Sequence, residues 1–499
     1  MKLSKIGPRL ASIVLLLSLI LPLVSLTPGP TLAADPRPDP VHPLLARMMD
    51  ENPDGMFRVI VMGNGKPDRL DSEVDRKGGK GKKSLPSIQG VAAELPTKAI
   101  RELAKHPDAK WVTIDAPMVP TVDASRLATD YPKAVNAPEV WNGDRKITGA
   151  GVTVAVLDSG INSGSADFID PSTGNNRVVG RVKFNSNTTS GNDGYGHGTH
   201  VAGIIAANGS ASRGRYIGIA PQVNLVNVKV SDDQGMSYVS DVINALQWVV
   251  LNRAAYNIRV VNLSLVSAVA ESYLTSPLDA AVEMAWLSGI VVVVSAGNLG
   301  PDSMLYPPAN DPLVITVGAV DTDGEEDIED HTVPFWSSYG QTQNGFSKPE
   351  VVAPGRRIVS NLASKSAVLA RQFPDRIVDY SYLRLSGTSM AAPIVSGIAA
   401  LALQAHPKWT PDQLKDVLIT TARPLDSAGD GAGEVDARAV VNKENPGSAN
   451  RGVPLNLGVA ATAGTLTYDS ATWNSATWNS ATWNSATWNS ATWNSARPD

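Results

Sequence analysis

The chain has 499 residues, which is enough for more than one domain and for a large hydrophobic core. Hydrophobic residues make up 43% of it and charged residues 18%, a balance typical of a globular rather than a disordered protein. The net charge of −5 is modest for this length and gives no indication of a nucleic-acid partner, and the absence of cysteine excludes disulfides and thiolate metal sites.

The first residues have the pattern of a targeting segment. Basic residues up to Arg9 precede an apolar run over residues 10–21, and small residues follow as far as Ala34. The apolar run is too short to span a bilayer comfortably. We therefore expect residues 1–34 to be a removed signal peptide rather than a retained anchor, and the mature protein to be secreted.

The next stretch, residues 35–120, predicts a small α+β unit. Strands are expected over residues 57–62, 88–95 and 110–114, and a helix over residues 97–105. Glycine and lysine dominate residues 75–83 and no aromatic residue lies among them, which favours a solvated loop over a nucleic-acid site.

From about residue 140 to 440, strand and helix patterns alternate. Strands are expected over residues 151–157, 223–230, 260–265, 290–295 and 313–317, and helices over residues 199–207, 239–252, 277–287, 390–405 and 411–421. This order predicts a doubly wound α/β fold, a mostly parallel sheet with helices on both faces. Asp158 and Asn298 lie just past two of these strands, at the carboxyl ends where such folds place their chemistry.

Ser389 lies in a turn of small residues that leads into an apolar, alanine-rich helix. Such a serine can be a helix cap, or a nucleophile if a histidine base and a group orienting that base are nearby. His197, between two glycines, and Asp158 are the candidates. Asp158 can also cap a turn, and His197 with His200 can form a metal pair, although the glutamate of the zinc motif is missing.

Three segments in chain order, LDSGI at Asp158, GHGTHVAG at His197 and SGTSMAAP at Ser389, resemble the subtilisin-like serine proteases. The resemblance implies a catalytic domain over residues 121–445, in which Ser389 attacks the peptide carbonyl and His197 is the general base. It implies that Asp158 orients the histidine and that the Asn298 amide stabilises the oxyanion.

The same resemblance implies that residues 35–120 are a propeptide, an intramolecular chaperone and inhibitor. Its sheet is expected to dock on the catalytic domain, with the chain after Ile114 crossing the cleft as an added strand. The cleavage point is expected between Asp115 and Tyr131.

For the substrate pocket, the resemblance implies walls made by Ser264, Leu265, Val266, Ala296, Gly297 and Leu305. Val266 and Leu305 stand where relatives often have glycine. The added bulk leads us to expect a preference for small or medium apolar residues before the scissile bond.

No cofactor is expected to be required for the chemistry, and no metal ligand is assigned. A structural calcium ion is an alternative without support, because Asp167 is a single carboxylate and the relatives' calcium insertion lacks its usual asparagine here. The acidic loop over residues 321–330 does not have EF-hand spacing and is expected to be a solvated surface loop.

Residues 446–499 are expected to be a linker and a low-complexity tail. Ser-Ala-Thr-Trp-Asn occurs five times in tandem over residues 470–494. Because a period of five matches neither the helix period of 3.6 nor the strand period of two, the tryptophans would not share one face of a helix or of a strand. A dispensable tail is favoured over a contact with carbohydrate or with a cell-envelope partner through stacked tryptophans.

Together these features predict a secreted, self-processing serine endopeptidase that acts on polypeptides through an acyl-enzyme. Two other classes remain: a catalytically silent secreted binding protein that uses the Trp-rich tail, and a serine hydrolase acting on bonds other than peptides. Retention of all three triad residues with Asn298 disfavours the first, and the expected propeptide and strand-pairing pocket disfavour the second.

Overall fold

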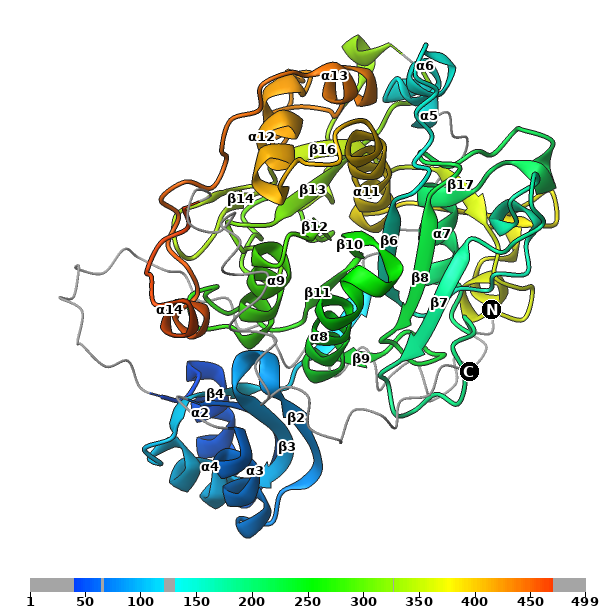
Figure 1. Ribbon diagram of the computed structural model, residues 1–499. Helices are drawn as coiled ribbons and strands as arrows, with labels where there is room; N and C mark the ends of the chain where they lie inside the picture. The colour runs from blue at the N-terminus through cyan, green and yellow to red at the C-terminus, as the bar shows by residue number, and fades with distance from the viewer. Residues whose placement is uncertain (1–39, 64–66, 121–130, 326, 470–499) are drawn as a thin grey trace, which may run out of the picture. The chain divides into compact units, whose positions relative to one another are not determined.

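The computed structural model describes residues 40–63, 67–120, 131–325 and 327–469 (Figure 1). The expected signal peptide and the tandem tryptophan repeats lie outside the described residues. So does most of the stretch in which the propeptide cleavage point is expected.

The N-terminal unit, residues 40–120, is built on an antiparallel sheet with the order β2-β3-β1-β4. Its strands are β1 (Met56–Gly63), β2 (Lys80–Leu85), β3 (Gly90–Pro96) and β4 (Ala109–Ile114), and its helices are α2 (Pro43–Glu51), α3 (Pro67–Arg76) and α4 (Thr97–Ala104). The three predicted strands and the predicted helix are confirmed. The helices cover one face of the sheet, where Leu45, Val59, Val74 and Ile100 form a separate apolar core.

The prediction of a loop over residues 75–83 is wrong in part, because Lys80–Leu85 is strand β2 and pairs with β3. The first three residues of this strand are exposed, as is common for a lysine-rich edge strand. Backbone pairing with a neighbouring strand, which no local pattern reveals, overrides the low strand propensity of glycine and lysine.

The main sheet has seven strands in the order β16-β13-β12-β10-β6-β8-β7, all parallel to their neighbours. They are β6 (Thr153–Asp158), β7 (Val178–Lys183), β8 (Asn224–Lys229), β10 (Ile258–Leu263), β12 (Val291–Ser295), β13 (Ile315–Val320) and β16 (Val351–Pro354). The five predicted strands are confirmed, and the edge strands β7 and β16 are additional. Every residue of β6, β12 and β13 is buried, as expected for strands covered on both faces.

Two pairs of helices pack on this sheet, α7 with α11 and α8 with α9 (Figure 1). The helices of the seven-stranded domain are α5 (Tyr131–Ala134), α6 (Ala137–Asn142), α7 (His197–Ala206), α8 (Val239–Tyr256), α9 (Pro277–Leu287), α10 (Val368–Gln372), α11 (Thr388–Ala405), α12 (Pro411–Thr421) and α13 (Ala437–Asn442). Among the described residues, only α11 is long and apolar enough to cross a membrane, and it is 89% buried as the central core helix. The predicted doubly wound α/β architecture is confirmed.

Three smaller sheets complete the domain: β11-β5-β9, β14-β15 and β17-β19-β18. Their strands are β5 (Pro117–Pro120), β9 (Ser237–Tyr238), β11 (Leu265–Ser267), β14 (Gly340–Gln341), β15 (Ser347–Lys348), β17 (Ile358–Asn361), β18 (Ile377–Val378) and β19 (Tyr382–Leu385). β5, the last strand of residues 40–120, is the middle strand of one of these sheets and pairs with two strands of the seven-stranded domain.

Residues 446–469, interpreted from the sequence as a linker, are packed against the seven-stranded domain. They include helix α14 (Leu457–Ala463), which contacts α9. Leu455, Val459 and Tyr468 are buried in the main apolar core. These apolar positions are too few and too widely spaced for a sequence pattern to distinguish this segment from a linker.

Candidate active site

Asp158 and His197 form a buried pair at the carboxyl edge of the main sheet. Asp158 is the last residue of β6, and His197 is the first residue of α7, after Gly196 in a left-handed conformation (φ 102°). Nδ1 of His197 lies 2.8 and 2.9 Å from the two carboxylate oxygens of Asp158. A carboxylate can only accept, so Nδ1 carries the proton and Nε2 of the neutral ring is left with its lone pair.

Asp193 holds the turn that presents His197. Its buried carboxylate accepts hydrogen bonds from the Ser159 hydroxyl at 2.8 Å, from Gly196 N–H at 2.7 Å, and from the Thr199 N–H and hydroxyl at 2.8 and 2.7 Å. Burial raises the pKa of Asp193, and these donors oppose the shift. Asp193 is not among the residues expected from the sequence, although an aspartate four residues before a glycine-flanked histidine is a visible signal.

Ser389 lies in the first turn of α11 and contacts Ser264, the residue that follows β10. Its hydroxyl donates to the Ser264 carbonyl at 3.2 Å, and the Ser264 hydroxyl donates to the Ser389 carbonyl at 3.1 Å. Nε2 of His197 is buried and has no hydrogen-bond partner among the described residues. The Ser389 hydroxyl thus bonds the residue before β11 and not His197 Nε2. Hydrogen bonds between catalytic groups often tighten only when substrate binds.

Asn298 follows β12 and is fixed by Thr388. Its side-chain oxygen accepts from Thr388 N–H at 3.0 Å and from the Thr388 hydroxyl at 3.2 Å, and that hydroxyl accepts from Gly297 N–H at 3.0 Å. These contacts orient the amide, so Nδ2 is the free end. It is a buried donor without a partner among the described residues, which suits an incoming anionic oxygen.

Five of the six residues predicted to wall the pocket lie along two chain segments whose ends bond the first turn of α11, Ser264 with Ser389 and Gly297 with Thr388. Leu265 and Val266 belong to β11, directly after Ser264, and Ala296 and Gly297 follow β12. β11 pairs with β5, Leu265 opposite Pro120 and Val266 opposite Val119.

Leu305 lies in a separate loop. Its carbonyl accepts from Glu271 N–H at 3.1 Å, and Pro307 of the same loop accepts from Ser267 N–H at 2.7 Å. The backbone contacts thus link this loop to β11 and its continuation.

Both metal alternatives from the sequence involve residues with other partners. Asp167 accepts from the Tyr382 hydroxyl at 2.6 Å, from the Asn361 amide at 2.9 Å and from Ala211 N–H at 2.9 Å. Burial lowers the pKa of His200 to about 3, and its Nε2 lies 2.9 Å from the Leu383 carbonyl. Within the described ranges, no group of three or more acidic or histidine side chains is arranged to hold a metal ion.

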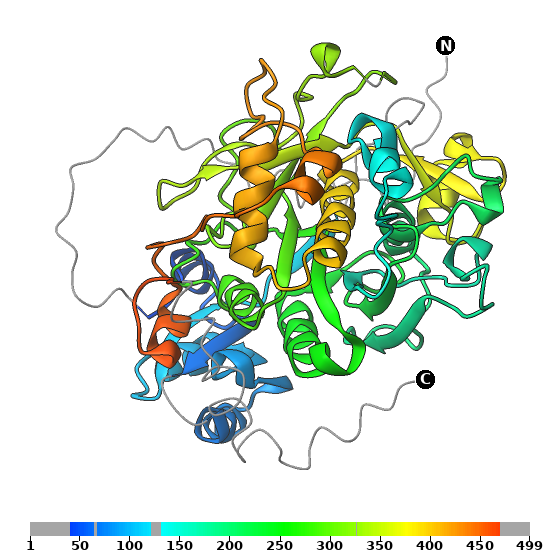
Figure 2. The same ribbon diagram turned by 45° about the horizontal axis from the view of Figure 1, so that its top comes forward.

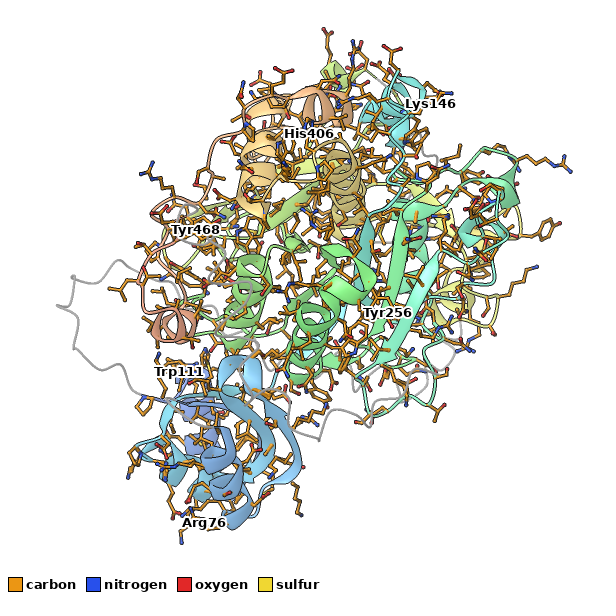
Figure 3. All side chains as sticks on the ribbon, in the orientation of Figure 1. Arg76, Trp111, Lys146, Tyr256, His406 and Tyr468 are labelled. Atoms are coloured by element: carbon orange, nitrogen blue, oxygen red, sulfur yellow. The ribbon has the colours of Figure 1, made fainter. Side chains whose placement is uncertain are left out.

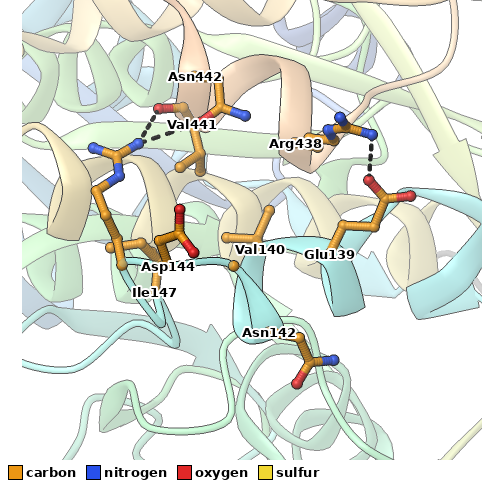
Figure 4. A pocket seen from close by; sticks show the side chains of 10 residues that line it. Glu139, Val140, Asn142, Asp144, Ile147, Arg438, Val441 and Asn442 are labelled. Carbon is orange, nitrogen blue, oxygen red and sulfur yellow. Dashed lines mark hydrogen bonds and ion pairs between the residues drawn. The ribbon is translucent and has the colours of Figure 1, made fainter.

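A surface pocket between α6 and α13 lies apart from these residues (Figure 4). On its walls Arg438 bonds Glu139 at 2.6 Å, and Arg145 donates to the Val441 carbonyl at 3.0 Å. None of the predicted site residues lines it.

Comparisons with known proteins identify the family of this chain. A model of the Subtilase family (Peptidase S8) matches residues 149–452. Serine protease AprX from Bacillus subtilis (strain 168) is 40% identical over 296 residues, 57% of this chain and 64% of AprX, so the chain spans less than two thirds of that relative. Subtilisin NAT from Bacillus subtilis subsp. natto is 35% identical over 364 residues, 70% of this chain and 80% of that protein.

Among solved structures, fervidolysin from Fervidobacterium pennivorans, a keratinolytic enzyme related to subtilisin, matches with a TM-score of 0.61 and 25% identity. The match covers 80% of this chain and 62% of fervidolysin. The family model covers more than half of the 499 residues, including the segments around Asp158, His197 and Ser389. The chain therefore belongs to the Subtilase family, the subtilisin-like serine endopeptidases.

Proposed function

We propose that this protein is a secreted endopeptidase that hydrolyses peptide bonds through Asp158, His197 and Ser389. The observation that carries the proposal is the Asp158–His197 pair, bonded at 2.8 Å, whose outer nitrogen is free to accept a proton. A serine hydroxyl needs such a base to become a nucleophile at neutral pH. No cofactor takes part in this chemistry.

In the proposed reaction, Ser389 Oγ attacks the peptide carbonyl carbon and passes its proton to His197 Nε2. Asp158 stabilises the imidazolium that forms, and the Asn298 amide donates to the oxyanion. When the C–N bond breaks, the imidazolium protonates the leaving amine. Water then attacks the acyl-enzyme by the same route, which regenerates the Ser389 hydroxyl and releases the acid product.

We propose further that residues 35–120 are a propeptide that inhibits the enzyme. β5 pairs antiparallel with both β11 and β9, in the way that a substrate strand would be held between two edges. Asp115 accepts from Ser240 N–H at 2.8 Å and from the Ser240 hydroxyl at 2.7 Å, at the amino end of α8. These contacts support a docked, substrate-like propeptide.

Export through residues 1–34 is part of the same proposal, and its support is the basic and apolar pattern of that segment. For the tail, the regular tryptophans of residues 470–494 support a contact with carbohydrate or a cell-envelope partner. A pull-down on insoluble polysaccharide, comparing the full chain with a chain ending at Asp469, tests the contact. Equal retention of the two would contradict it.

Self-processing tests the catalytic proposal. Wild type and Ser389→Ala are expressed as full chains in a host that lacks its own extracellular proteases. Wild type is expected to convert to a mature form, and Ser389→Ala to remain uncleaved because it lacks the nucleophile. Ser381→Ala is the matched control. It changes an exposed serine directly before β19 and is expected to mature normally. Equal processing of wild type and Ser389→Ala would contradict the assignment.

A further inference from the structure

The segment after the family match folds on itself. The family model ends at residue 452, and residues 453–469 follow it. Leu455 N–H donates to the Leu466 carbonyl at 2.9 Å, and Tyr468 N–H donates to the Val453 carbonyl at 2.8 Å. These bonds close a loop around α14, which we call the C-terminal clip (residues 453–469).

Buried polar contacts anchor the clip to α9 of the catalytic domain. Asn456 N–H lies 3.0 Å from both carboxylate oxygens of Glu283, and its amide donates to the Ser276 carbonyl at 3.0 Å. Asn456 and Glu283 are both fully buried. The Tyr273 hydroxyl donates to the Pro454 carbonyl at 3.1 Å, so the clip is held from two directions.

The clip also meets the N-terminal unit. Lys110 Nζ donates to the Leu457 carbonyl at 2.6 Å, and the Gln89 amide donates to the Thr462 hydroxyl at 3.3 Å. A Cβ atom on Gly458 would lie 2.8 Å from the Met62 methyl group, so this position of α14 is in close contact with a side chain of β1. Figures 1 and 2 both show α14 beside the N-terminal sheet.

The apolar face of the N-terminal sheet continues this contact. Met62 and Trp111 belong to the same buried cluster as Val459 and Ala460 of α14, and Trp111 is labelled at that side of the sheet in Figure 3. The Trp111 indole N–H donates to Glu271 of the catalytic domain at 3.2 Å. The N-terminal sheet therefore packs on a surface of the seven-stranded domain that includes the clip.

We propose that the C-terminal clip is part of the docking surface for the propeptide and slows its release after cleavage. The proposal rests on the proposed inhibitory role of residues 35–120 and adds a second partner to it. Contacts that exist only in the docked state are lost on dissociation, so they act mainly on the dissociation rate. The clip thereby lengthens the interval between self-cleavage and activity.

Two substitutions in the full chain test this contact from its two sides. Gly458→Leu places a side chain in the space of Met62, at a helical position whose backbone any residue can adopt. Lys110→Met removes the ammonium donor from the propeptide and leaves the mature enzyme chemically unchanged. The controls are Ala461→Leu, at an exposed position of the same helix, and Lys105→Met, an exposed lysine of the propeptide.

The measurement follows two signals in each full-chain protein: propeptide cleavage on gels, and the later appearance of activity on a small chromogenic peptide. Gly458→Leu and Lys110→Met are expected to shorten the interval between the two by about three- to tenfold, the scale of one or two lost contacts. The controls are expected to match wild type, as is the final kcat/KM of all variants.

An interval that Lys110→Met and Gly458→Leu leave unchanged overturns the clip proposal, provided that cleavage occurs. Failure of wild type to cleave itself, or cleavage of Ser389→Ala, contradicts the proposed function instead. Because the variants are compared only after cleavage is seen, the two failures are distinguishable.

Discussion

Asn298 can serve as a donor only because Thr388 holds its side-chain oxygen. The Thr388 backbone N–H and hydroxyl both point to that oxygen, and Thr388 is the residue directly before Ser389. The amide and the nucleophile are thus positioned by neighbouring residues of one helix turn. A donor fixed before the reaction needs no reorganisation when negative charge develops.

The first prediction concerns this donor. Asn298→Ala is expected to lower kcat by about 10²- to 10³-fold, a magnitude taken from the loss of such an amide in subtilisin itself. KM is expected to change little, because the donor acts on the transition state. Steady-state kinetics on a peptide substrate measure both constants. An unchanged kcat would exclude Asn298 from the oxyanion site.

A second prediction concerns the pocket wall. Val266 lies on β11, the strand that pairs with β5, and is expected to exclude large side chains before the scissile bond. Val266→Gly should shift the preference from small or medium apolar residues toward aromatic ones by about 10- to 200-fold in kcat/KM, the value of one or more methylenes in such a pocket. Profiling a peptide library with both proteins checks it. Wild type that already favours Phe and Tyr would refute the steric role.

At the scale of elements, β5 shows how the N-terminal unit is connected to the site. It runs antiparallel to β11, and its last residue, Pro120, lies opposite Leu265, the residue after Ser264. The Ser264 carbonyl accepts the hydrogen bond from the Ser389 hydroxyl. The carboxyl end of β5 therefore lies close to the proposed nucleophile.

The place of β5 gives a third prediction, the position of self-cleavage. The bond is expected to lie soon after Pro120 and before Tyr131, because Tyr131 is already buried and its hydroxyl donates to the Ile217 carbonyl at 3.2 Å. Mass spectrometry of the mature protein locates its first residue. A mature chain that begins before Pro120 or after Tyr131 is incompatible with the pairing of β5.

At the scale of the whole molecule, an acidic group lies at the contact between the N-terminal unit and the seven-stranded domain. The Glu271 carboxylate accepts from Trp111 of the N-terminal unit at 3.2 Å. Burial raises the pKa of Glu271 from an ordinary 4.5 to about 7, although hydrogen bonds to the carboxylate oppose the shift. Separation of the N-terminal unit is expected to return this pKa toward 4.5, so the contact is predicted to weaken as pH rises from about 4.5 through about 7.

The fourth prediction follows from this weakening of the contact with rising pH. After self-cleavage, propeptide release from wild type is expected to accelerate over this pH range, and Glu271→Gln, which cannot titrate, should flatten the dependence. Release is measured as the delay before activity, with cleavage monitored separately. A pH profile that is the same in Glu271→Gln and wild type would assign the dependence to other groups.

Local patterns in the sequence were sufficient to predict the central strands of the main sheet and the core helix α11. The valine-rich runs of β6, β8, β10, β12 and β13 and the apolar helix after Ser389 are each recognisable from their own residues, because burial on both faces requires continuous apolar segments. Asp158 is the last residue of β6, and Asn298 lies three residues after the end of β12, so both positions follow from the strands. The three family segments together identify the fold class and the family, which the comparisons confirm.

Other features depend on contacts between distant parts of the chain, so no local pattern contains them. β2 is a strand because β3 supplies its backbone partners, and Asp193 holds His197 because Ser159 and Thr199 converge on it. Residues 453–469 resemble a linker in sequence, and only their hydrogen bonds with Glu283 and Tyr273 show that they are part of the folded domain. The sequence by itself determined the family and the candidate chemistry. The tertiary structure alone decided which residues orient the site and what surrounds the N-terminal unit, because both depend on non-local hydrogen bonds and packing.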